Sequence, residues 1–409
     1  MFARRTEWPL ESNALTREIE SRRERGLPVL DLTESNPTRC GFYYDSASIQ
    51  RALAKPEALI YKPEPRGALP AREAVAGYYA EHGVAVDPQH IFLTASTSEA
   101  YSYLFRLLGD PGDAVLVPRP SYPLFDFLAG LNDLEIISYP LAYCPNRGFN
   151  QDADGPGWQI DLDELSACLD RAGRVFHLPR AVIVVHPNNP TGSFVSAGQI
   201  SILLALCRRH DLALIADEVF RDYALRGPDV SSLPATHAQL DSTLTFTLSG
   251  LSKVSALPQM KLAWIVVSGP PERRDQALER LEIIADTYLS VGAPVAAALP
   301  ELLETRRAIQ PQIIARLRHN LAELDRQLAA RSCAAGLQVE GGWYAVLELT
   351  GSEDSADKMA VELAREEGVL MHPGHFYEFP SDGYLVLSLI TPEDQFAEGI
   401  RKLIARLEA

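Results

Sequence analysis

The chain has 409 residues and a formal net charge of -16, and 46% of its residues are hydrophobic. This size predicts a globular protein of two domains, and the acidic charge argues against a nucleic-acid partner, which needs a basic surface. No run approaches the roughly 20 apolar residues of a membrane helix, and the N-terminal residues lack the apolar core of a signal peptide. The cysteines are scattered, which favours reduced thiols in a cytoplasm.

The first predicted elements are a charged surface helix over residues 10–25, a short strand over 29–32, a turn-rich loop over 35–41 and a helix over 68–82. Strands and helices then alternate. The predicted strands cover 90–94, 114–117, 135–139, 181–185, 212–216, 244–248 and 262–267, and the helices cover 98–108, 122–131 and 196–210. Strands that are apolar on both faces and alternate with helices predict a mostly parallel sheet covered by helices.

The remaining segments predict a second, smaller unit. Residues 143–158 are rich in turn formers and predict a surface excursion, and a helical stretch from 276 to about 331 is interrupted at Pro294 and Pro311. A strand over 344–349, a helix over 355–367, a strand over 385–389 and a helix over 392–407 complete the chain. We therefore predict an α/β/α three-layer large domain over 49–290 and a small α+β domain built from 1–48 and 291–409.

Several polar residues follow predicted strands, where ligands of open parallel sheets bind. Asp217 is open to two interpretations: a helix N-cap, or a carboxylate that keeps a pyridinium nitrogen protonated. Lys253 is either a solvated loop lysine or a Schiff-base amine with a lowered pKa. Asn189, unlike its neighbour Asn188, has an alternative to a turn role, which is a hydrogen bond to the ring oxygen of a cofactor.

Two further loops have the same character. Ser96 and Glu99 fit a capping box, while the hydroxyls of Ser96, Thr97 and Ser98 at a helix start also fit an anion site. Tyr122 follows another strand, where it either packs or stacks on a planar ring.

These residues resemble the class I and II aminotransferases, which are fold type I enzymes dependent on pyridoxal 5'-phosphate (PLP). The resemblance covers nearly the whole chain. It rests on Tyr61 with Gly67, on 96–98, Tyr122, 186–192, Asp217 with Glu218, and 249–253, with 341–344 and 373–376 as small-domain signatures. It implies transfer of an amino group between an amino acid or related amine and a 2-oxo acid by a ping-pong mechanism, within amino-acid metabolism.

The resemblance also implies a role for each residue. Lys253 would bind PLP covalently and then move a proton between the substrate Cα and the cofactor. Asp217 would pair with the pyridine nitrogen, Asn189 would bond the ring oxygen, and Tyr122 would stack on the ring. The phosphate would be held by Ser96, Thr97, Ser98, Ser249, Ser252 and Lys261. Tyr61 would reach the phosphate of a neighbouring subunit, so a homodimer with shared sites is expected, and no metal is expected.

Three positions depart from the family pattern. Lys261 stands where an arginine usually contacts the phosphate. A lysine keeps the positive charge but cannot bind the phosphate with two parallel N–H groups. Phe220 stands where a tyrosine usually bonds the ring oxygen, so we expect a higher pKa for the lysine–cofactor linkage. Val386 stands where an arginine usually binds the substrate carboxylate, and an aliphatic side chain cannot do so.

The valine leaves the substrate site open to interpretation. Arg39 is our first candidate for the carboxylate, although a solvated arginine fits the sequence nearly as well, and Asn36 and His375 are weaker candidates. The same departure keeps a PLP-dependent lyase, cyclase or oxidase as the alternative. A non-catalytic PLP-fold regulator is disfavoured by Lys253, and a nicotinamide dehydrogenase by the lack of a Gly-x-Gly-x-x-Gly motif.

Overall fold

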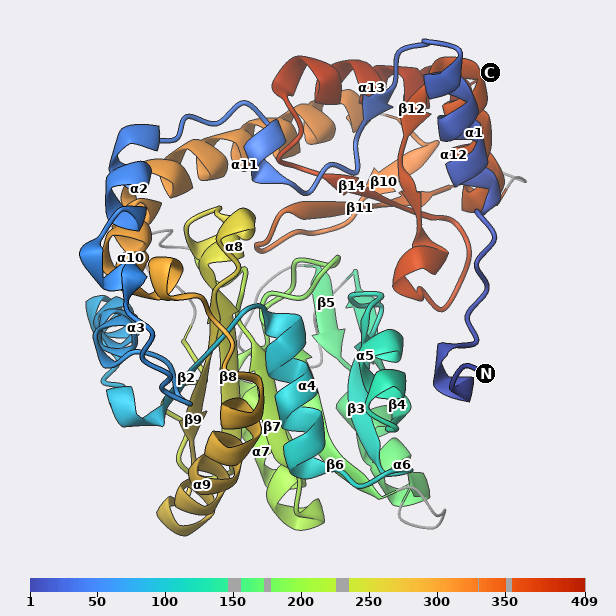
Figure 1. Cartoon of the computed structure of the whole chain (residues 1–409). Coiled ribbons are helices and arrows are strands. Elements are labelled where there is room, and N and C mark those ends of the chain that lie inside the picture. The colour runs from blue at the N-terminus through green and yellow to red at the C-terminus, as the bar shows by residue number, and fades with distance from the viewer. Residues whose placement is uncertain (146–155, 173–177, 226–234, 330, 351–354, 409) are drawn as a thin grey trace.

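The computed structural model describes residues 1–145, 156–172, 178–225, 235–329, 331–350 and 355–408. Its largest unit is an eight-stranded sheet in the order β2-β9-β8-β7-β6-β3-β4-β5 (Figure 1). The strands are β2 Ile91–Thr94, β3 Ala114–Arg119, β4 Glu135–Cys144, β5 Gly157–Ile160, β6 Pro179–Val185, β7 Ala213–Asp217, β8 Thr245–Gly250 and β9 Ala263–Ser268. Strands β3, β4, β6, β7 and β8 pair in parallel, while β9 is antiparallel to β8, β2 to β9, and β5 to β4. The prediction of a mostly parallel sheet is confirmed.

Helices cover both faces of this sheet. One face packs against α4 (Thr97–Leu108), α5 (Phe125–Leu131) and α9 (Pro271–Tyr288), and the other against α6 (Leu162–Ala172) and α7 (Ala197–His210). Successive side chains of a strand point to opposite faces. On β6, Ala181 and Ile183 accordingly belong to the first layer, and Val182 and Val184 to the second. This is the predicted α/β/α arrangement.

A third apolar cluster lies beside β2 and β9. It includes residues of α2 (Ser46–Leu53), α3 (Leu69–Glu81), α8 (Leu251–Val254) and α10 (Ala293–Glu304). Helix α2 spans the predicted boundary at 49, and α10, which was assigned to the small domain, shares this cluster with α3. The domain boundaries at 49 and 290 therefore stay predictions.

The C-terminal part forms a four-stranded antiparallel sheet in the order β10-β11-β14-β13. The strands are β10 Ala334–Gly336, β11 Tyr344–Leu349, β13 His372–Pro373 and β14 Tyr384–Ser388. A two-stranded parallel sheet joins β1 (Leu30–Asp31) near the N-terminus to β12 (Val369–Leu370). Segments from both chain ends thus lie side by side (Figure 1).

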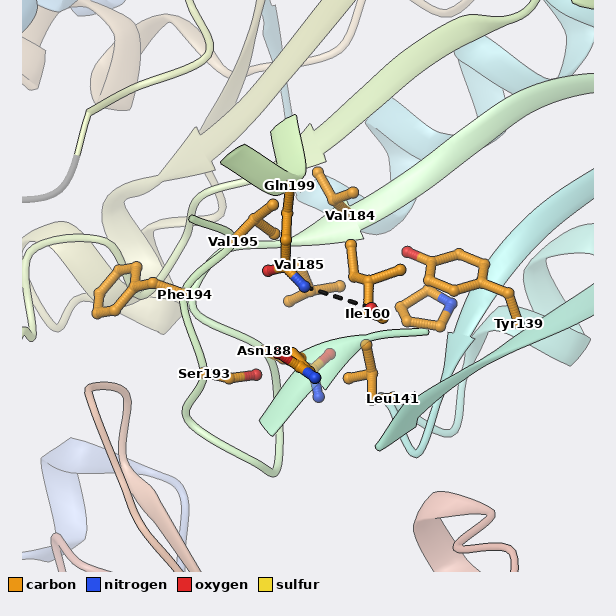
Figure 2. A pocket seen from close by; sticks show the side chains of 12 residues that line it. Tyr139, Leu141, Ile160, Val184, Val185, Asn188, Ser193, Phe194, Val195 and Gln199 are labelled. Carbon is orange, nitrogen blue, oxygen red and sulfur yellow. Dashed lines mark hydrogen bonds between the residues drawn. The ribbon is translucent and has the colours of Figure 1, made fainter. Parts of the chain in front are cut away.

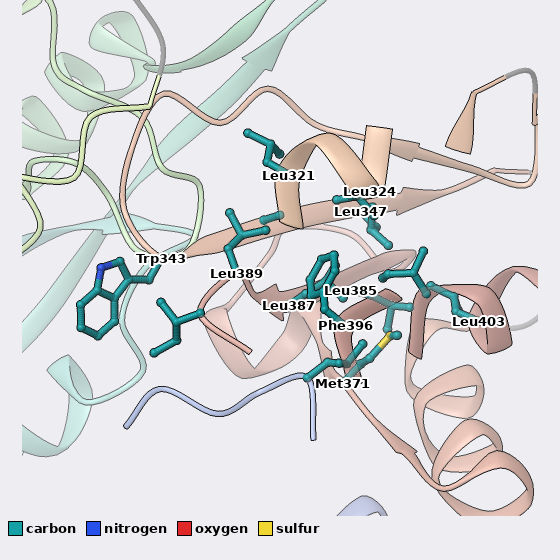
Figure 3. Close-up of a cluster of buried hydrophobic side chains, with 14 of the residues drawn as sticks. Leu321, Leu324, Trp343, Leu347, Met371, Leu385, Leu387, Leu389, Phe396 and Leu403 are labelled. Atoms are coloured by element: carbon teal, nitrogen blue, oxygen red, sulfur yellow. The ribbon is translucent and has the colours of Figure 1, made fainter. Parts of the chain in front are cut away.

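The small sheet is covered by α1 (Ala14–Glu24), α11 (Arg306–Leu328), α12 (Ala356–Glu362) and α13 (Glu393–Leu407), with a π-helical turn, η6, over Leu363–Glu367. Figure 3 shows the cluster between them, where Leu385 and Leu387 of β14 meet Phe396 and Leu403 of α13. Short helical turns complete the chain: η1 Arg4–Thr6, η2 Pro37–Arg39, η3 Pro56–Leu59, η4 Pro88–His90, η5 Pro258–Met260 and η7 Gly374–Tyr377.

Two details of the sequence prediction need correction. Pro311 does not interrupt a helix but lies inside α11, while the break falls at Thr305. Burial of Ile309, Ile313 and Leu317 offsets the backbone hydrogen bond that a proline removes. The predicted excursion over 143–158 contains the end of β4 and the start of β5, and its central residues 146–155 lie outside the described residues.

Candidate active site

Five loops meet at one edge of the large sheet, because β2, β3, β6, β7 and β8 point the same way. They carry residues 96–98, 120–122, 188–189, 217 and 251–253. Figure 1 shows α8 at this edge, between the large sheet and β11 of the small one. The candidate site therefore lies where the two units face each other.

Lys253 is the third residue of α8, the single turn that follows β8 directly. Its Nζ lies 4.4 Å from the ring centroid of Trp343 and 5.1 Å from that of Phe220. Burial lowers the pKa of Lys253 to about 8, while the negative charge of Asp217 acts in the opposite direction. An amine with this pKa is partly neutral at physiological pH, which a nucleophilic lysine requires.

Asp217 ends β7, and two donors hold its carboxylate. The N–H of Val219 donates to Oδ1 at 3.1 Å, and the hydroxyl of Tyr101 donates to Oδ2 at 3.0 Å. Burial raises the pKa of Asp217 to about 6, and these hydrogen bonds and Lys253 oppose the rise. The helix N-cap interpretation is wrong, because residues 219–222 form a turn. The carboxylate lies near enough to Lys253 for each charge to shift the other group's pKa.

The two asparagines after β6 have different environments. Asn188 Nδ2 donates to the carbonyl of Pro120 at 3.1 Å and to Thr191 Oγ1 at 3.0 Å, and its Oδ1 accepts from Ser121 at 3.3 Å. Asn189 is buried, and its Oδ1 has no partner among the described groups. Because an amide flip exchanges oxygen and nitrogen, this end can offer an N–H to a ligand. Asn188 holds the loop, and Asn189 is available for binding.

The start of α4 combines a cap with an anion site. Ser96 Oγ accepts from the N–H of Glu99 at 3.1 Å, as predicted. The reciprocal bond is displaced by one residue, because Glu99 accepts from the N–H of Ala95 at 2.7 Å. Thr97 and Ser98 are half-buried in the first turn, where free N–H groups and the helix dipole favour an anion.

The other predicted phosphate ligands have unequal settings. Ser249 is buried, and its Oγ has no partner in the described part of the chain. Ser252 is half-buried, and Lys261 is exposed with a left-handed backbone, φ 52°. Ser249 thus offers a buried donor, whereas Lys261 offers a solvated charge.

The two predicted aromatic contacts lie apart. Tyr122 packs edge-to-face on Phe125, with ring centroids 6.2 Å apart, and its pKa is raised by burial and by the charge of Asp217. Tyr61 is 82% exposed and lines a broad groove of about 790 Å³ between residues 55–70 and 289–300. Tyr122 therefore faces the site of its own chain, and Tyr61 faces outward.

The substrate candidates also differ. The side chain of Arg39 is 75% exposed, and its Nη1 lies 4.0 Å from a carboxylate oxygen of Glu34. Asn36 caps η2 by accepting from the N–H of Thr38 at 3.1 Å. His375 Nδ1 lies 2.5 Å from Asp357. Arg39 is only loosely paired, whereas Asn36 and His375 have local partners.

Val386 is buried among other side chains of the protein. It is 1% exposed on β14, opposite Val346 and His372, and packs in a cluster with Tyr377 and Phe379. A substrate carboxylate would need a cation here, and the valine is already covered by protein.

Two features of the site were not predicted from the sequence. Tyr101 was covered only by the predicted helix over 98–108, yet its hydroxyl donates to Asp217. Trp343 was noted only as part of a motif, yet its ring covers the amine of Lys253. The position of Tyr101 one turn after the Ser96 loop was the available signal.

A separate small cavity lies behind the 188–195 loop (Figure 2). It offers about 10 Å³ to the centre of a water molecule, roughly the space of one water. Gln199 Nε2 donates to the carbonyl of Ile160 at 3.3 Å across it. A cofactor does not fit there, so the strand-end site is the relevant one.

The strand-end residues fit PLP. A partly neutral amine and a carboxylate interact electrostatically, and a helix N-terminus offers an anion site. The Asn189 amide oxygen and the Ser249 hydroxyl are buried without a partner among the described residues, so both can bind a ligand. The described residues contain no group of three or more His, Cys, Asp and Glu that could hold a metal ion. No helix in the described part of the chain is long and apolar enough to cross a membrane.

Residues 44–402 match the family described as aminotransferase class I and II. The chain is 26% identical to the glutamate-pyruvate aminotransferase AlaA of Haemophilus influenzae, over 93% of this chain and 91% of that protein. It is 25% identical to the alanine aminotransferase of Mycobacterium tuberculosis, over 97% and 88%. The solved alanine aminotransferase of Pyrococcus furiosus has a TM-score of 0.84 at 19% identity, with 100% of both chains covered, which shows a common fold.

The chain therefore belongs to the class I and II aminotransferases, the family that the sequence resemblance predicted. It has the fold type I architecture and is a PLP-dependent aminotransferase.

Proposed function

We propose that this aminotransferase binds PLP between Lys253 and Asp217 and moves amino groups among glutamate, alanine and their 2-oxo acids. The proposal rests on Lys253, whose pKa burial lowers, and on Asp217, whose charge acts on that amine. The substrates follow from the names of the relatives, which include glutamate-pyruvate and alanine aminotransferases.

Bound PLP supplies an electron sink for the carbanion that forms at the substrate Cα. Lys253 would hold the cofactor covalently and would carry the proton between the substrate Cα and the cofactor. Asp217, ionised at neutral pH, would keep the pyridine nitrogen protonated. Asn189 would donate to the ring oxygen, and Tyr122 would stack on the ring. Trp343 excludes water from the amine.

The phosphate is assigned to the start of α4, through Ser96, Thr97 and Ser98, and to Ser249, Ser252 and Lys261. The helix N-terminus supplies backbone donors there, and the buried Ser249 hydroxyl has no competing partner. The exposed Lys261 adds charge without a fixed geometry.

A donor panel tests the activity. Borohydride trapping of the protein with PLP alone should label Lys253. Addition of glutamate or alanine to untrapped, PLP-loaded protein should then give the pyridoxamine form and a 2-oxo acid. Lys253→Ala should lose the label and about 10³-fold or more of the rate. A label on another lysine would contradict the proposal.

We assign the substrate carboxylate to Arg39. The position on β14 is a buried valine, while Arg39 is exposed and only loosely paired with Glu34. Arg39→Ala should raise KM by about tenfold or more, the loss of a charge-assisted hydrogen bond. Arg273, exposed and paired with Asp211 at 2.5 Å, is the matched control. Equal KM values for the two variants would remove Arg39 from the site.

We also propose a homodimer in the cytoplasm. Leu59, Ile60 and Tyr61 are exposed beside the groove of about 790 Å³, and adjoining exposed apolar residues mark contact surfaces. A second copy covering this face would bring Tyr61 to the partner's phosphate site. The cysteines are free, which supports a reducing compartment.

A further inference from the structure

Tyr101 holds a position that the assigned functions leave unexplained. It lies on α4, is buried, and donates its hydroxyl proton to Oδ2 of Asp217 at 3.0 Å. Its ring is fixed by an edge-to-face contact with Phe125, with centroids 5.3 Å apart, and a tilted contact with Phe105 at 5.8 Å. The rings explain why position 101 is aromatic, but only the hydroxyl explains a tyrosine in place of phenylalanine.

The hydrogen bond has a defined direction. Burial and the neighbouring charge of Asp217 raise the pKa of Tyr101 well above its ordinary value. The phenol therefore keeps its proton and acts as donor to Asp217. Donation to a carboxylate favours the ionised form over the neutral one, and it opposes the burial that raises the pKa of Asp217 to about 6.

Few other groups influence this carboxylate. Among the described residues, Glu218 raises the pKa of Asp217, whereas Lys253 and the N–H of Val219 lower it. The charge of Asp217 and burial both raise the pKa of Tyr122, so this phenol adds no charge beside Asp217 at neutral pH. Tyr101 is thus the only described side chain bonded to Asp217.

We propose that Tyr101 is a positioning residue, whose hydroxyl keeps Asp217 ionised and oriented for the pyridine nitrogen of PLP. This inference rests on the assignment of Asp217 to that nitrogen. Phe220 lies near Lys253 in place of a tyrosine, whereas the Tyr101 hydroxyl would act at the nitrogen end of the cofactor ring, through its hydrogen bond to Asp217.

The first test compares PLP affinity. Tyr101→Phe keeps the ring contacts and removes the hydroxyl, so PLP should dissociate about tenfold more readily from the reconstituted enzyme, as expected for a lost hydrogen bond to a charged group. Tyr139→Phe is the matched control. Tyr139 is buried beside the small cavity, and its hydroxyl donates to the carbonyl of Ile183 at 2.6 Å. It should bind PLP as the natural enzyme does.

The second test uses the protein without PLP. Burial raises the pKa of Asp217 from 3.8 to about 6, so its ionisation costs stability, and this cost appears as the pH rises from about 4 to above 6. Loss of the donor raises the pKa further. Tyr101→Phe should therefore lower Tm more at about pH 8 than at about pH 5, whereas Tyr139→Phe should lower Tm equally at both.

The combined results distinguish a failure of the inference about Tyr101 from a failure of the proposed function. Unchanged PLP affinity together with a pH-independent loss of Tm in Tyr101→Phe would show a purely structural tyrosine and overturn the inference alone. A natural enzyme that fails to bind PLP would overturn the proposed function, and this inference with it. Weaker PLP binding with a pH-dependent loss of Tm supports both.

Discussion

The reactivity of Lys253 comes from its surroundings. Its amine lies against the rings of Trp343 and Phe220 and faces Asp217. Removal from water lowers its pKa to about 8, and the opposing charge keeps the pKa from falling further. The balance between these two effects sets the fraction of neutral amine at working pH.

The rate of PLP association should report this balance. Because only the neutral amine attacks the cofactor aldehyde, the association rate should rise with pH around a midpoint of about 8. Asp217→Asn removes the charge that raises the pKa, so its midpoint should lie lower. Stopped-flow absorbance measures both, and a midpoint near the ordinary lysine value of 10.5 would contradict the burial argument.

Phe220 lies beside the same amine but carries no hydroxyl. Its ring is buried 5.1 Å from Lys253 Nζ, where a hydroxyl could reach the cofactor ring oxygen. Phe220→Tyr should lower the pH at which the bound cofactor's absorbance changes, because the added donor stabilises the deprotonated form. Phe220→Leu, which adds no hydroxyl, is the control. An unmoved midpoint in the tyrosine variant would count against this role.

At the scale of elements, the site depends on how the small unit docks on the large one. The N–H of Gly341 donates to the carbonyl of Gly192 at 2.9 Å, and that of Gly342 to Tyr223 at 2.9 Å. The contact places Trp343, the next residue, over Lys253. Two loops distant in sequence therefore define the wall of the site.

Gly192 is where this docking is most sensitive. It has φ +69°, and a Cβ there would lie 2.5 Å from the carbonyl oxygen of Gly341. Gly83 also has a positive φ, +76°, but open space around it. Gly83→Ala should cost about 1 kcal/mol for the backbone alone, and Gly192→Ala about 2 kcal/mol more because the docking must shift. Urea unfolding measures the loss of unfolding free energy in each variant. Equal losses would mean that Gly341 can move away from the added Cβ at no cost.

The strand-end loops were the part of the site that the sequence could predict. Asp217, Asn189 and Lys253 each follow an apolar strand, and strands of one direction bring their ends together. The reversed direction of β9 could not be read, because an apolar run has the same appearance in either direction. The role of Tyr101 could not be predicted either, because a buried tyrosine in a helix is most often a core residue, and only the fold brings its hydroxyl to Asp217.

The surroundings of Val386 and Arg39 depend on residues distant in the sequence and could not be predicted from it. The sequence showed that Val386 cannot bind a carboxylate, but only the structure shows that it is covered. Arg39 could be named as a candidate, yet its exposure and loose pairing with Glu34 depend on distant neighbours. The predicted roles of the individual site residues stay predictions that the variants above test.

For the whole molecule, the groove beside Tyr61 is the surface through which we expect two copies of the chain to form a dimer. Ile60 is 61% exposed there. Ile60→Glu should convert a dimer into single chains of 45.0 kDa, because burying an unpaired carboxylate opposes association. Ile202→Glu, at a 44% exposed isoleucine on α7, is the control. Sedimentation distinguishes the species, and a natural enzyme that already sediments as one chain would contradict the proposed dimer.

Trp343 lies directly before β11, late in the chain, and this has a consequence for biosynthesis. During translation Lys253 leaves the ribosome well before Trp343 does, so the nascent polypeptide carries the lysine without the indole that shields it. Its amine then stays hydrated and mostly protonated. We expect the yellow colour of the coenzyme to develop only after chain release, once the last strands have folded back over it.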